Sequence, residues 1–329
     1  MKKVRTLDEN LGLNPSNLHK SGIAVGFLPA FGEPFASNTP REINAKLPAP
    51  MAIVGDYVDL KTSDPNLSSI DKSLEVIRGL EGNPVWELAL MPNEGLDKIT
   101  KEVAVSISKK MLWINNQGIT VWMRFAHEMN GDWYSWGLQP EKFIEKWRLI
   151  AHEVKSRTQK TYMLWAPNSA FGESLDSVRG GYTKYWPGAD TVDISGLSFY
   201  HYGGFERLNV LLAPGEAVSK IKEFAQLYGS AQNRPVILSE TGASYTTSIS
   251  TGKPAWGGGS EYDIKYQWLQ QLLSSKTREE IPNLKAIAWF EVFKHETAAG
   301  NSPLKAEDFR LILGDQGLSH DAIQYLSEK

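Results

Sequence analysis

Cysteine is absent from the sequence, which excludes a disulfide framework and any thiolate chemistry. No long run of Lys or Arg occurs, and 35 basic residues stand against 38 acidic ones, so nucleic acid is not an expected partner. No stretch is long and apolar enough to span a membrane, and residues 1–15 lack the apolar core of a signal peptide. The expected compartment stays open between an exported chain whose leader has been removed and a chain that remains in the cytoplasm.

The sequence is long and rich in aromatic residues, and both features bear on the fold. The 329 residues fit a single (β/α)8 domain with insertions, and the hydrophobic share of 41% supplies a sizeable core. No composition break or internal repeat divides the chain, so we expect a polar lead-in over residues 1–20 and one domain over 21–329. Most of the 11 Trp and 12 Tyr residues are expected in the core of that domain.

Eight short apolar segments alternate with segments of helical periodicity. The expected strands are residues 21–28, 51–55, 84–91, 119–125, 161–166, 192–200, 236–240 and 284–292. The expected helices are residues 64–77, 96–115, 140–154, 217–228 and 262–273, with one more at the end of the chain. The strands read as continuous apolar runs, which is typical of buried parallel strands. The sequence therefore predicts an α/β protein, a (β/α)8 TIM barrel in a single domain, with a doubly wound open sheet as the alternative.

Three polar stretches are expected to be loops: residues 30–48, 241–261 and 294–315. The last two follow the seventh and eighth expected strands, so they should lie at the carboxyl-end face of the barrel. Loops on that face build the active sites of barrel enzymes.

The stretch 121–137 organises the chain. It opens as a strand and closes as a loop that contains two Trp residues and one Tyr. His127 and Glu128 stand at the junction, and the carboxyl end of a strand is where an α/β barrel places its chemistry. Flat aromatic faces beside polar groups suit sugar rings, which favours Trp133 and Trp136 as stacking residues.

These residues resemble glycoside hydrolase family 26, which contains many β-mannanases. The resemblance rests on the motif Arg-x-x-His-Glu-Met-Asn-Gly-x-Trp, which runs from Arg124 to Trp133 and is followed by Trp136 and Gly137. It implies that Glu128 is the acid/base of a retaining endo-β-glycoside hydrolase that acts on β-1,4-mannan or a related β-linked polysaccharide. The family also contains enzymes that act on β-glucans and on β-1,3-xylan, so the sugar stays open, and this substrate class favours an exported enzyme. We expect no cofactor, no metal and a monomer.

Glycoside hydrolysis needs a second carboxyl group. Glu240 closes the seventh expected strand, across the barrel mouth from the fourth strand and Glu128. The pair resembles the retaining barrel enzymes of clan A, which implies that Glu240 is the nucleophile. The two carboxyl groups are then expected about 5–5.5 Å apart, with Glu128 protonated and Glu240 ionised.

Further candidates surround this pair. Arg124 shares a strand face with Glu128, and it either holds a carboxylate ionised or forms an ion pair in the barrel interior. His127 is expected to bind substrate or a catalytic neighbour, because a zinc motif would need a second His at position 131, which is Gly.

The resemblance to clan A enzymes implies two more roles. Tyr200 would donate a hydrogen bond to the nucleophile, with an aromatic residue of the barrel rim as the alternative. Trp289 would floor the subsite that holds the glycosyl unit, with a core tryptophan as the alternative. Asn168 and Asp56 follow or end strands and are further substrate-binding candidates.

Two other classes of function compete with the hydrolase. A carbohydrate-binding barrel that has lost catalysis would lack one of the two glutamates, and both Glu128 and Glu240 are present. A metal-dependent hydrolase is disfavoured because the six histidines are scattered along the chain.

Overall fold

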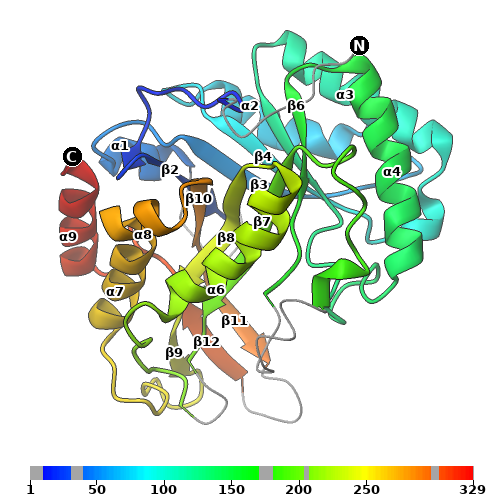
Figure 1. Ribbon diagram of the computed structural model, residues 1–329. Helices are drawn as coiled ribbons and strands as arrows, with labels where there is room; N and C mark the ends of the chain where they lie inside the picture. The colour runs from blue at the N-terminus through cyan, green and yellow to red at the C-terminus, as the bar shows by residue number, and fades with distance from the viewer. Residues whose placement is uncertain (1–9, 31–39, 170–180, 204–206, 298–303, 329) are drawn as a thin grey trace.

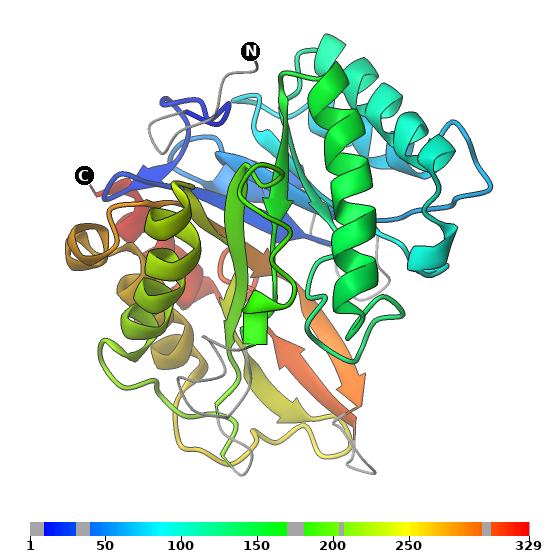
Figure 2. The same ribbon diagram turned by 45° about the vertical axis from the view of Figure 1, so that its right-hand side comes forward.

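The computed structural model of the protein describes residues 10–30, 40–169, 181–203, 207–297 and 304–328. Eight parallel strands form a barrel that is closed by the pairing of β2 with both β3 and β10, and helices surround it (Figures 1 and 2). The strands are β2 (Ile23–Pro29), β3 (Ile53–Asp59), β4 (Val85–Met91), β5 (Val121–Phe125), β6 (Thr161–Trp165), β7 (Ile194–His201), β8 (Val236–Ala243) and β10 (Leu284–Glu291). The predicted barrel is confirmed, and the open sheet is excluded because both edges of the sheet pair with each other.

Helices cover the outside of the barrel where the sequence periodicity predicts them. They are α1 (Pro40–Lys46), α2 (Asp71–Arg78), α3 (Lys101–Asn116), α4 (Pro140–Arg157), α6 (Glu216–Phe224), α7 (Glu261–Leu273), α8 (Ser275–Glu280) and α9 (Gln316–Ser327). Two short helices, α1 and α8, were not expected from the sequence, and α1 lies in the expected loop 30–48, of which 31–39 fall outside the described residues. None of the helices in the described ranges has the length and apolar composition needed to cross a membrane.

The two polar stretches after β8 and β10 are not simply loops. They contribute β9 (Tyr245–Ser248), β11 (Phe293–Thr297) and β12 (Leu304–Asp308), which form a three-stranded antiparallel sheet in the order β11, β12, β9. β9 and β11 begin two residues after β8 and β10 end, so this small sheet lies beyond the carboxyl ends of these strands, at the bottom of Figure 1. The sequence did not reveal it because its short strands are mostly polar and pair only with one another.

One end of the barrel interior is apolar. A cluster of buried side chains there takes at least one residue from each strand or its edge, and its members are Leu11, Ala24, Ala52, Ile53, Val85, Trp122, Leu164, Ala166, Ile194, Ile237 and Ala286. The indole of Trp122 donates a hydrogen bond to the carbonyl of Leu11 at 2.9 Å, so the chain before β1 (His19–Lys20) closes this end. The described part of the lead-in therefore packs against the barrel, whereas residues 1–9 lie outside the described residues.

The next layer of the interior is polar. Glu87 and Arg124 stand two residues beyond Val85 and Trp122, so they point into the barrel one level higher. Both side chains are fully buried, with the Nε of Arg124 at 3.8 Å from the Oε1 of Glu87. Burial above all, and the charge of Glu240, raise the pKa of Glu87 to about 8, although Arg124 lowers it. The carboxyl group of Glu87 is therefore protonated at neutral pH.

The first prediction concerns Glu87→Gln. The carboxyl group has its ordinary pKa of 4.5 in the unfolded chain and about 8 in the folded protein. Between these values the unfolded chain releases a proton that the folded protein keeps, so wild-type stability falls as the pH rises through this window. Gln is neutral at every pH, so the variant does not lose stability in this window. The free energy of unfolding of Glu87→Gln should therefore exceed that of wild type, by roughly 3 kcal/mol at pH 7.

Urea unfolding at intervals from pH 4 to pH 9 measures this difference, with Glu81→Gln, at an exposed carboxylate, as the matched control. A loss of stability in Glu87→Gln at pH 7, or a difference that does not change with pH, would show that Glu87 is ionised in the folded protein.

Candidate active site

The backbone at the end of β5 takes an unusual path. Ala126 and Glu128 both have positive φ, at 48° and 54°, in the left-handed region that favours glycine. Their amides nevertheless bond to the neighbouring strands, Ala126 to the carbonyl of Leu90 at 3.1 Å and Glu128 to that of Ala166 at 2.8 Å. Strained residues of this kind cluster at functional sites and persist only where the surroundings hold them. Here the flanking strands fix the position of Glu128.

Both oxygens of the Glu128 carboxyl group accept a hydrogen bond. The side-chain amide of Asn168 reaches Oε1 at 2.9 Å, and the indole nitrogen of Trp133 reaches Oε2 at 2.8 Å. Asn168 is itself held by Asn130, through two hydrogen bonds of 2.8 Å between the side chain of one residue and the backbone of the other. The loop after β5 therefore positions the donors as well as the acid.

A β-bulge in β8 aims Glu240. Against β7, Gly196 pairs with Ile237 and Ser198 with Glu240, so β8 has one residue more than β7 over this interval. The register against β10 shows the same extra residue between Leu238 and Thr241. Strict alternation from the inward-facing Ile237 would turn Glu240 outward, and the extra residue reverses this.

Glu240 faces two donors inside the barrel mouth. The Nη1 of Arg124 lies 2.5 Å from its Oε2, and the hydroxyl of Tyr200 donates to its Oε1. The Nη2 of Arg124 donates to the hydroxyl of Ser198 at 2.5 Å. A positive charge and a hydroxyl donor therefore both lie against the Glu240 carboxyl group.

Glu128 has the opposite environment. Burial is the largest cause that raises its pKa, and the negative charge of Glu240 raises it further. Arg124, Asn168 and Ser198 lower this pKa without cancelling the rise. The two carboxyl groups therefore interact electrostatically, and this interaction adds to the effect of burial on the pKa of Glu128.

Strand alternation corrects two predicted residues. Asp56 points out of the barrel, where the hydroxyl of Ser73 in α2 donates to it, so it is not at the site. Trp289 is 1% exposed and donates its indole N–H to the carbonyl of Phe309, so it is a core residue. The neighbours Tyr57 and Phe290 point into the mouth instead, with ring centroids 6.4 Å apart.

The aromatic loop after β5 divides into one exposed and one buried tryptophan. Trp133 is 47% exposed and contacts Glu128, as described above. Trp136 is fully buried, stacks on Tyr134 at 4.3 Å between ring centroids and donates to the carbonyl of His127 at 2.8 Å. The prediction that Trp136 stacks on substrate is therefore wrong, because no face of its ring is accessible.

His127 and Arg124 are also fully buried. The Nε2 of His127 lies 3.2 Å from the hydroxyl of Tyr134, and burial first, then the charge of Arg124, lower the pKa of the imidazole well below its ordinary value. A neutral His127 therefore supports the loop, and Arg124 supports Glu240. For His127, the structure favours contact with a neighbouring group over contact with substrate. For Arg124, the contact with Glu240 agrees with either predicted role, that of holding a carboxylate ionised or that of an ion pair in the barrel interior.

Four residues at the mouth were not singled out from the sequence. They are Tyr57, Ser198, Tyr202 and Phe290. A signal existed for three of them: counting in steps of two from the buried apolar residues of β3, β7 and β10 places Tyr57, Ser198 and Phe290 on the inner face. Tyr202 follows β7, and its ring centroid lies 5.3 Å from that of Tyr200.

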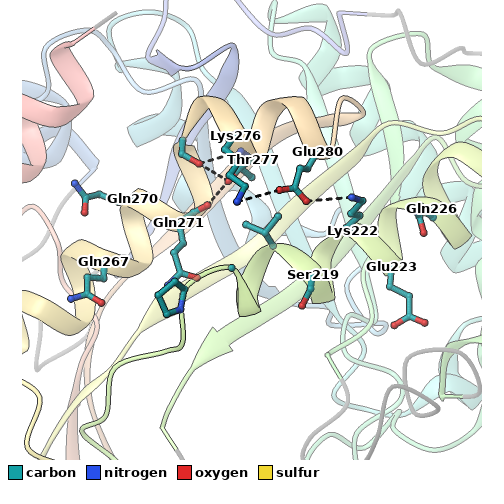
Figure 3. A pocket seen from close by; sticks show the side chains of 14 residues that line it. Ser219, Lys222, Glu223, Gln226, Gln267, Gln270, Gln271, Lys276, Thr277 and Glu280 are labelled. Carbon is teal, nitrogen blue, oxygen red and sulfur yellow. Dashed lines mark hydrogen bonds and ion pairs between the residues drawn. The ribbon is translucent and has the colours of Figure 1, made fainter.

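Two cavities bear on where a ligand can bind. A cavity of about 300 Å³ is lined by Trp133 and Asn168, the two donors to Glu128, and by other residues such as Lys184 and Tyr185. A second cavity, of about 750 Å³, lies outside the barrel among α6, α7 and α8, and side chains such as Lys222 and Gln271 line it (Figure 3). No candidate catalytic residue lines the second cavity. Within the described ranges no group of three or more His, Asp or Glu side chains is arranged to hold a metal ion.

Curated relatives match the chain over part of its length. A mannan endo-1,4-β-mannosidase from Bacillus subtilis is 30% identical over 121 residues, which are 36% of this chain and 34% of that protein. Endoglucanase H from Acetivibrio thermocellus is 25% identical over 154 residues, which are 42% of this chain and 15% of that protein. The matched segments thus span about a third of these relatives or less.

Solved structures match the whole fold. The catalytic domain of a family 26 endo-β-1,4-mannanase from a Bacillus species superposes with a TM-score of 0.61 and 15% identity, over 100% of this chain and 92% of that one. A fungal β-1,4-galactanase reaches 0.59 with 12% identity, over 88% and 90% of the two chains. At this identity the likeness establishes the barrel alone. The sequence model described as glycosyl hydrolase family 26 matches residues 91–256, just over half of the chain and including both Glu128 and Glu240, and the chain therefore belongs to this family.

Proposed function

We propose that the protein is a retaining endo-β-glycoside hydrolase that cleaves β-1,4-mannan, with Glu240 as nucleophile and Glu128 as acid/base. One observation carries the proposal. Two buried carboxyl groups interact at the barrel mouth, one beside Arg124 and Tyr200 and the other with a raised pKa. A double displacement needs this difference between an anion and a proton donor.

The first half of the reaction forms a bond to the enzyme. An oxygen of Glu240 attacks the anomeric carbon, and the bond from that carbon to the glycosidic oxygen breaks. The proton of Glu128 goes to the leaving oxygen, so the second sugar departs as an alcohol. Glu240 is then an ester, and its negative charge no longer raises the pKa of Glu128.

The second half reverses these roles. Glu128, now a carboxylate, takes a proton from water while the water oxygen attacks the anomeric carbon. The ester bond breaks, and Glu240 leaves as a carboxylate. Arg124 and the hydroxyl of Tyr200 stabilise that charge in both halves, since they already contact Glu240 in the free enzyme. Two displacements at one carbon retain its configuration.

Sugar binding is assigned by exposure. The half-buried rings of Tyr57, Tyr202 and Phe290 surround the mouth beside Glu240 and supply apolar faces for the glycosyl unit. The cavity lined by Trp133 and Asn168 adjoins the opposite carboxyl group, so we assign it to the leaving sugar. Mannan is proposed because relatives such as the Bacillus subtilis enzyme are named for that substrate.

A substrate panel tests the reaction and the sugar together. Soluble β-1,4-mannan, mixed-linkage β-glucan and β-1,3-xylan are incubated separately with the protein, and reducing ends and product lengths are followed with time. We expect the fastest cleavage on mannan, with internal products early in the reaction. Proton NMR of the first products should show the β configuration. Faster cleavage of glucan or xylan would overturn the sugar assignment, and first products of α configuration would overturn the double displacement.

The next prediction separates the roles of the two glutamates. Glu240→Ala should abolish turnover on every substrate, because no nucleophile remains. Glu128→Ala should still form the glycosyl-enzyme from an aryl β-mannoside with a good leaving group, since that step then needs little acid help. Azide should accelerate the slow second step of Glu128→Ala and give a β-glycosyl azide, whereas with Glu240→Ala any azide product should have the α configuration.

Mass spectrometry of the trapped intermediate and NMR of the azide products provide the readouts. Glu145→Gln, at an exposed carboxylate of α4, serves as the control. Identical behaviour of the two alanine variants with the aryl substrate and azide would contradict the assigned roles.

A further prediction concerns the hydrogen bond from Trp133 to Glu128. Trp133→Phe keeps an aromatic ring and removes the N–H that donates to Oε2. A donor stabilises the ionised form, so its loss should raise the pKa of Glu128 further. The alkaline limb of kcat/KM, where Glu128 loses its proton, should therefore move to higher pH by up to about one unit.

The same variant should slow the second half-reaction, because Glu128 must ionise to act as base. The control is Trp113→Phe, on an exposed tryptophan of α3. An alkaline limb that stays in place while KM rises would mean that Trp133 only stacks on the substrate.

A further inference from the structure

Trp256 has the largest exposed fraction of any large apolar side chain in the described part of the chain, at 69%. It lies in the loop between β9 and α7. This loop is at the carboxyl end of the barrel, the face that carries Glu128 and Glu240. Figure 1 shows this loop at the bottom of the view, beside the chain that follows β7. An exposed indole there is accessible to a substrate that extends out of the mouth.

Hydrogen bonds to a buried asparagine hold the loop around Trp256 in place. Asn209, only 1% exposed, bonds through its side chain to both backbone groups of Thr246 at 2.9 Å and to the carbonyl of Ala255 at 3.1 Å. Its backbone amide donates to the carbonyl of Trp256 at 3.3 Å, and its carbonyl accepts from Gly259 at 2.8 Å. The exposed ring is thus mounted on fixed backbone, which lowers the entropy cost of binding.

One face of the indole is backed by a cation. The guanidinium carbon of Arg207 lies 5.0 Å from the ring centroid of Trp256, and its Nη2 donates to the carbonyl of Gly257 at 3.3 Å. The other N–H groups of the guanidinium lie beside this face of the ring. An apolar plane beside fixed donors matches a sugar ring, which presents C–H groups on its face and hydroxyls at its rim.

The small sheet connects this platform to the catalytic mouth. Burial lowers the pKa of the Lys294 ammonium in β11, but the charges of Glu307 and Glu296, and then that of Glu240, raise it above its ordinary value. Lys294 therefore lies near enough to Glu240 to interact with it. From β11 the sheet continues through β12 to β9, and the chain returning at Pro254 bridges Thr247 in β9. Three strand spacings place this returning chain roughly 14 Å from β11.

We propose that Trp256 and Arg207 form a distal sugar-stacking platform, which binds one ring of a β-glycan chain whose scissile bond lies between the two catalytic glutamates. The platform rests on the proposed function and adds to it a preference for long substrates. A chain that reaches from the mouth to Trp256 gains the contact, whereas a short aryl glycoside does not extend that far.

The test compares a long and a short substrate. For Trp256→Ala, the ratio of kcat/KM on soluble β-1,4-mannan to kcat/KM on an aryl β-mannobioside should fall by about three- to tenfold, the size expected for one aromatic contact. Trp256→Phe should recover part of the ratio, and Arg207→Ala should lower it less. The matched control is Trp113→Ala: this indole is 46% exposed and has Lys110 4.7 Å from its ring centroid, but it lies near the carboxyl end of α3, away from the catalytic face.

A binding measurement separates this proposal from the catalytic one. Retardation of the proteins in native gels that contain soluble β-1,4-mannan needs no turnover, and Trp256→Ala should be retarded less than wild type or Trp113→Ala. Equal retardation and an unchanged ratio would overturn the platform even if the enzyme cleaves mannan. Normal retardation of wild type with no cleavage of any substrate would overturn the proposed function and leave the platform supported. A ratio that falls equally in Trp256→Ala and Trp113→Ala would also overturn the platform, since the loss would not depend on position.

Discussion

The guanidinium of Arg124 is a fully buried positive charge in the interior of the barrel, and the rest of the site is arranged around it. Burial alone would lower its pKa, but the charge of Glu240, then of other neighbours, more than offsets this, so the pKa is raised. A buried cation needs a compensating anion, because an unpaired charge in a protein interior is strongly destabilising. The Glu240 carboxyl group lies 2.5 Å from this cation and that of Glu87 lies 3.8 Å from it, and burial first, then the charge of Glu240, raise the pKa of Glu87 although Arg124 lowers it. The two carboxyl groups beside Arg124 therefore differ in their electrostatic surroundings, and this difference underlies the proposal that Glu240 is the nucleophile.

The same charges act on Glu128, the proposed acid. Burial raises the pKa of Glu128 most, and the charge of Glu240 raises it further. The charge of Arg124 lowers this pKa but does not cancel the rise. A second full cation next to Glu128 would lower its pKa. The neutral donors Asn168 and Trp133 orient Glu128 instead. Neutral hydrogen bonds fix its geometry and leave its charge free to change during the reaction.

Much of this arrangement was predictable from the sequence. Continuous apolar runs gave the barrel, and the motif around Glu128, together with Glu240 at the end of a strand, gave the two candidate carboxyl groups. Two site residues were predicted wrongly because the sequence did not show which face of its strand each of them occupies. Asp56 and Trp289 each stand one residue away from the inward-facing Tyr57 and Phe290, and a shift of one residue turns a strand side chain to the opposite face.

Alternation alone would also have placed Glu240 wrongly, since the bulge that turns it inward has no signal in the residues of β8. The burial of Trp136 was equally invisible, because Trp133 and Trp136 stand in the same short loop and only the folded loop stacks Trp136 on Tyr134. The small sheet escaped for a related reason: β9 and β12 pair across more than fifty residues of chain, and no local pattern encodes that pairing.

Backbone irregularities therefore position both of the proposed catalytic glutamates. The left-handed residues Ala126 and Glu128 at the end of β5, and the extra residue in β8, cost stability that regular strands would keep. Regular strands would aim their side chains along the alternation of the barrel, and the apolar layer around Trp122 shows what that alternation produces, a filled core without access. A site needs side chains that leave this pattern at two points facing each other. Since the strands between these points stay paired, the departures from the alternation remain local.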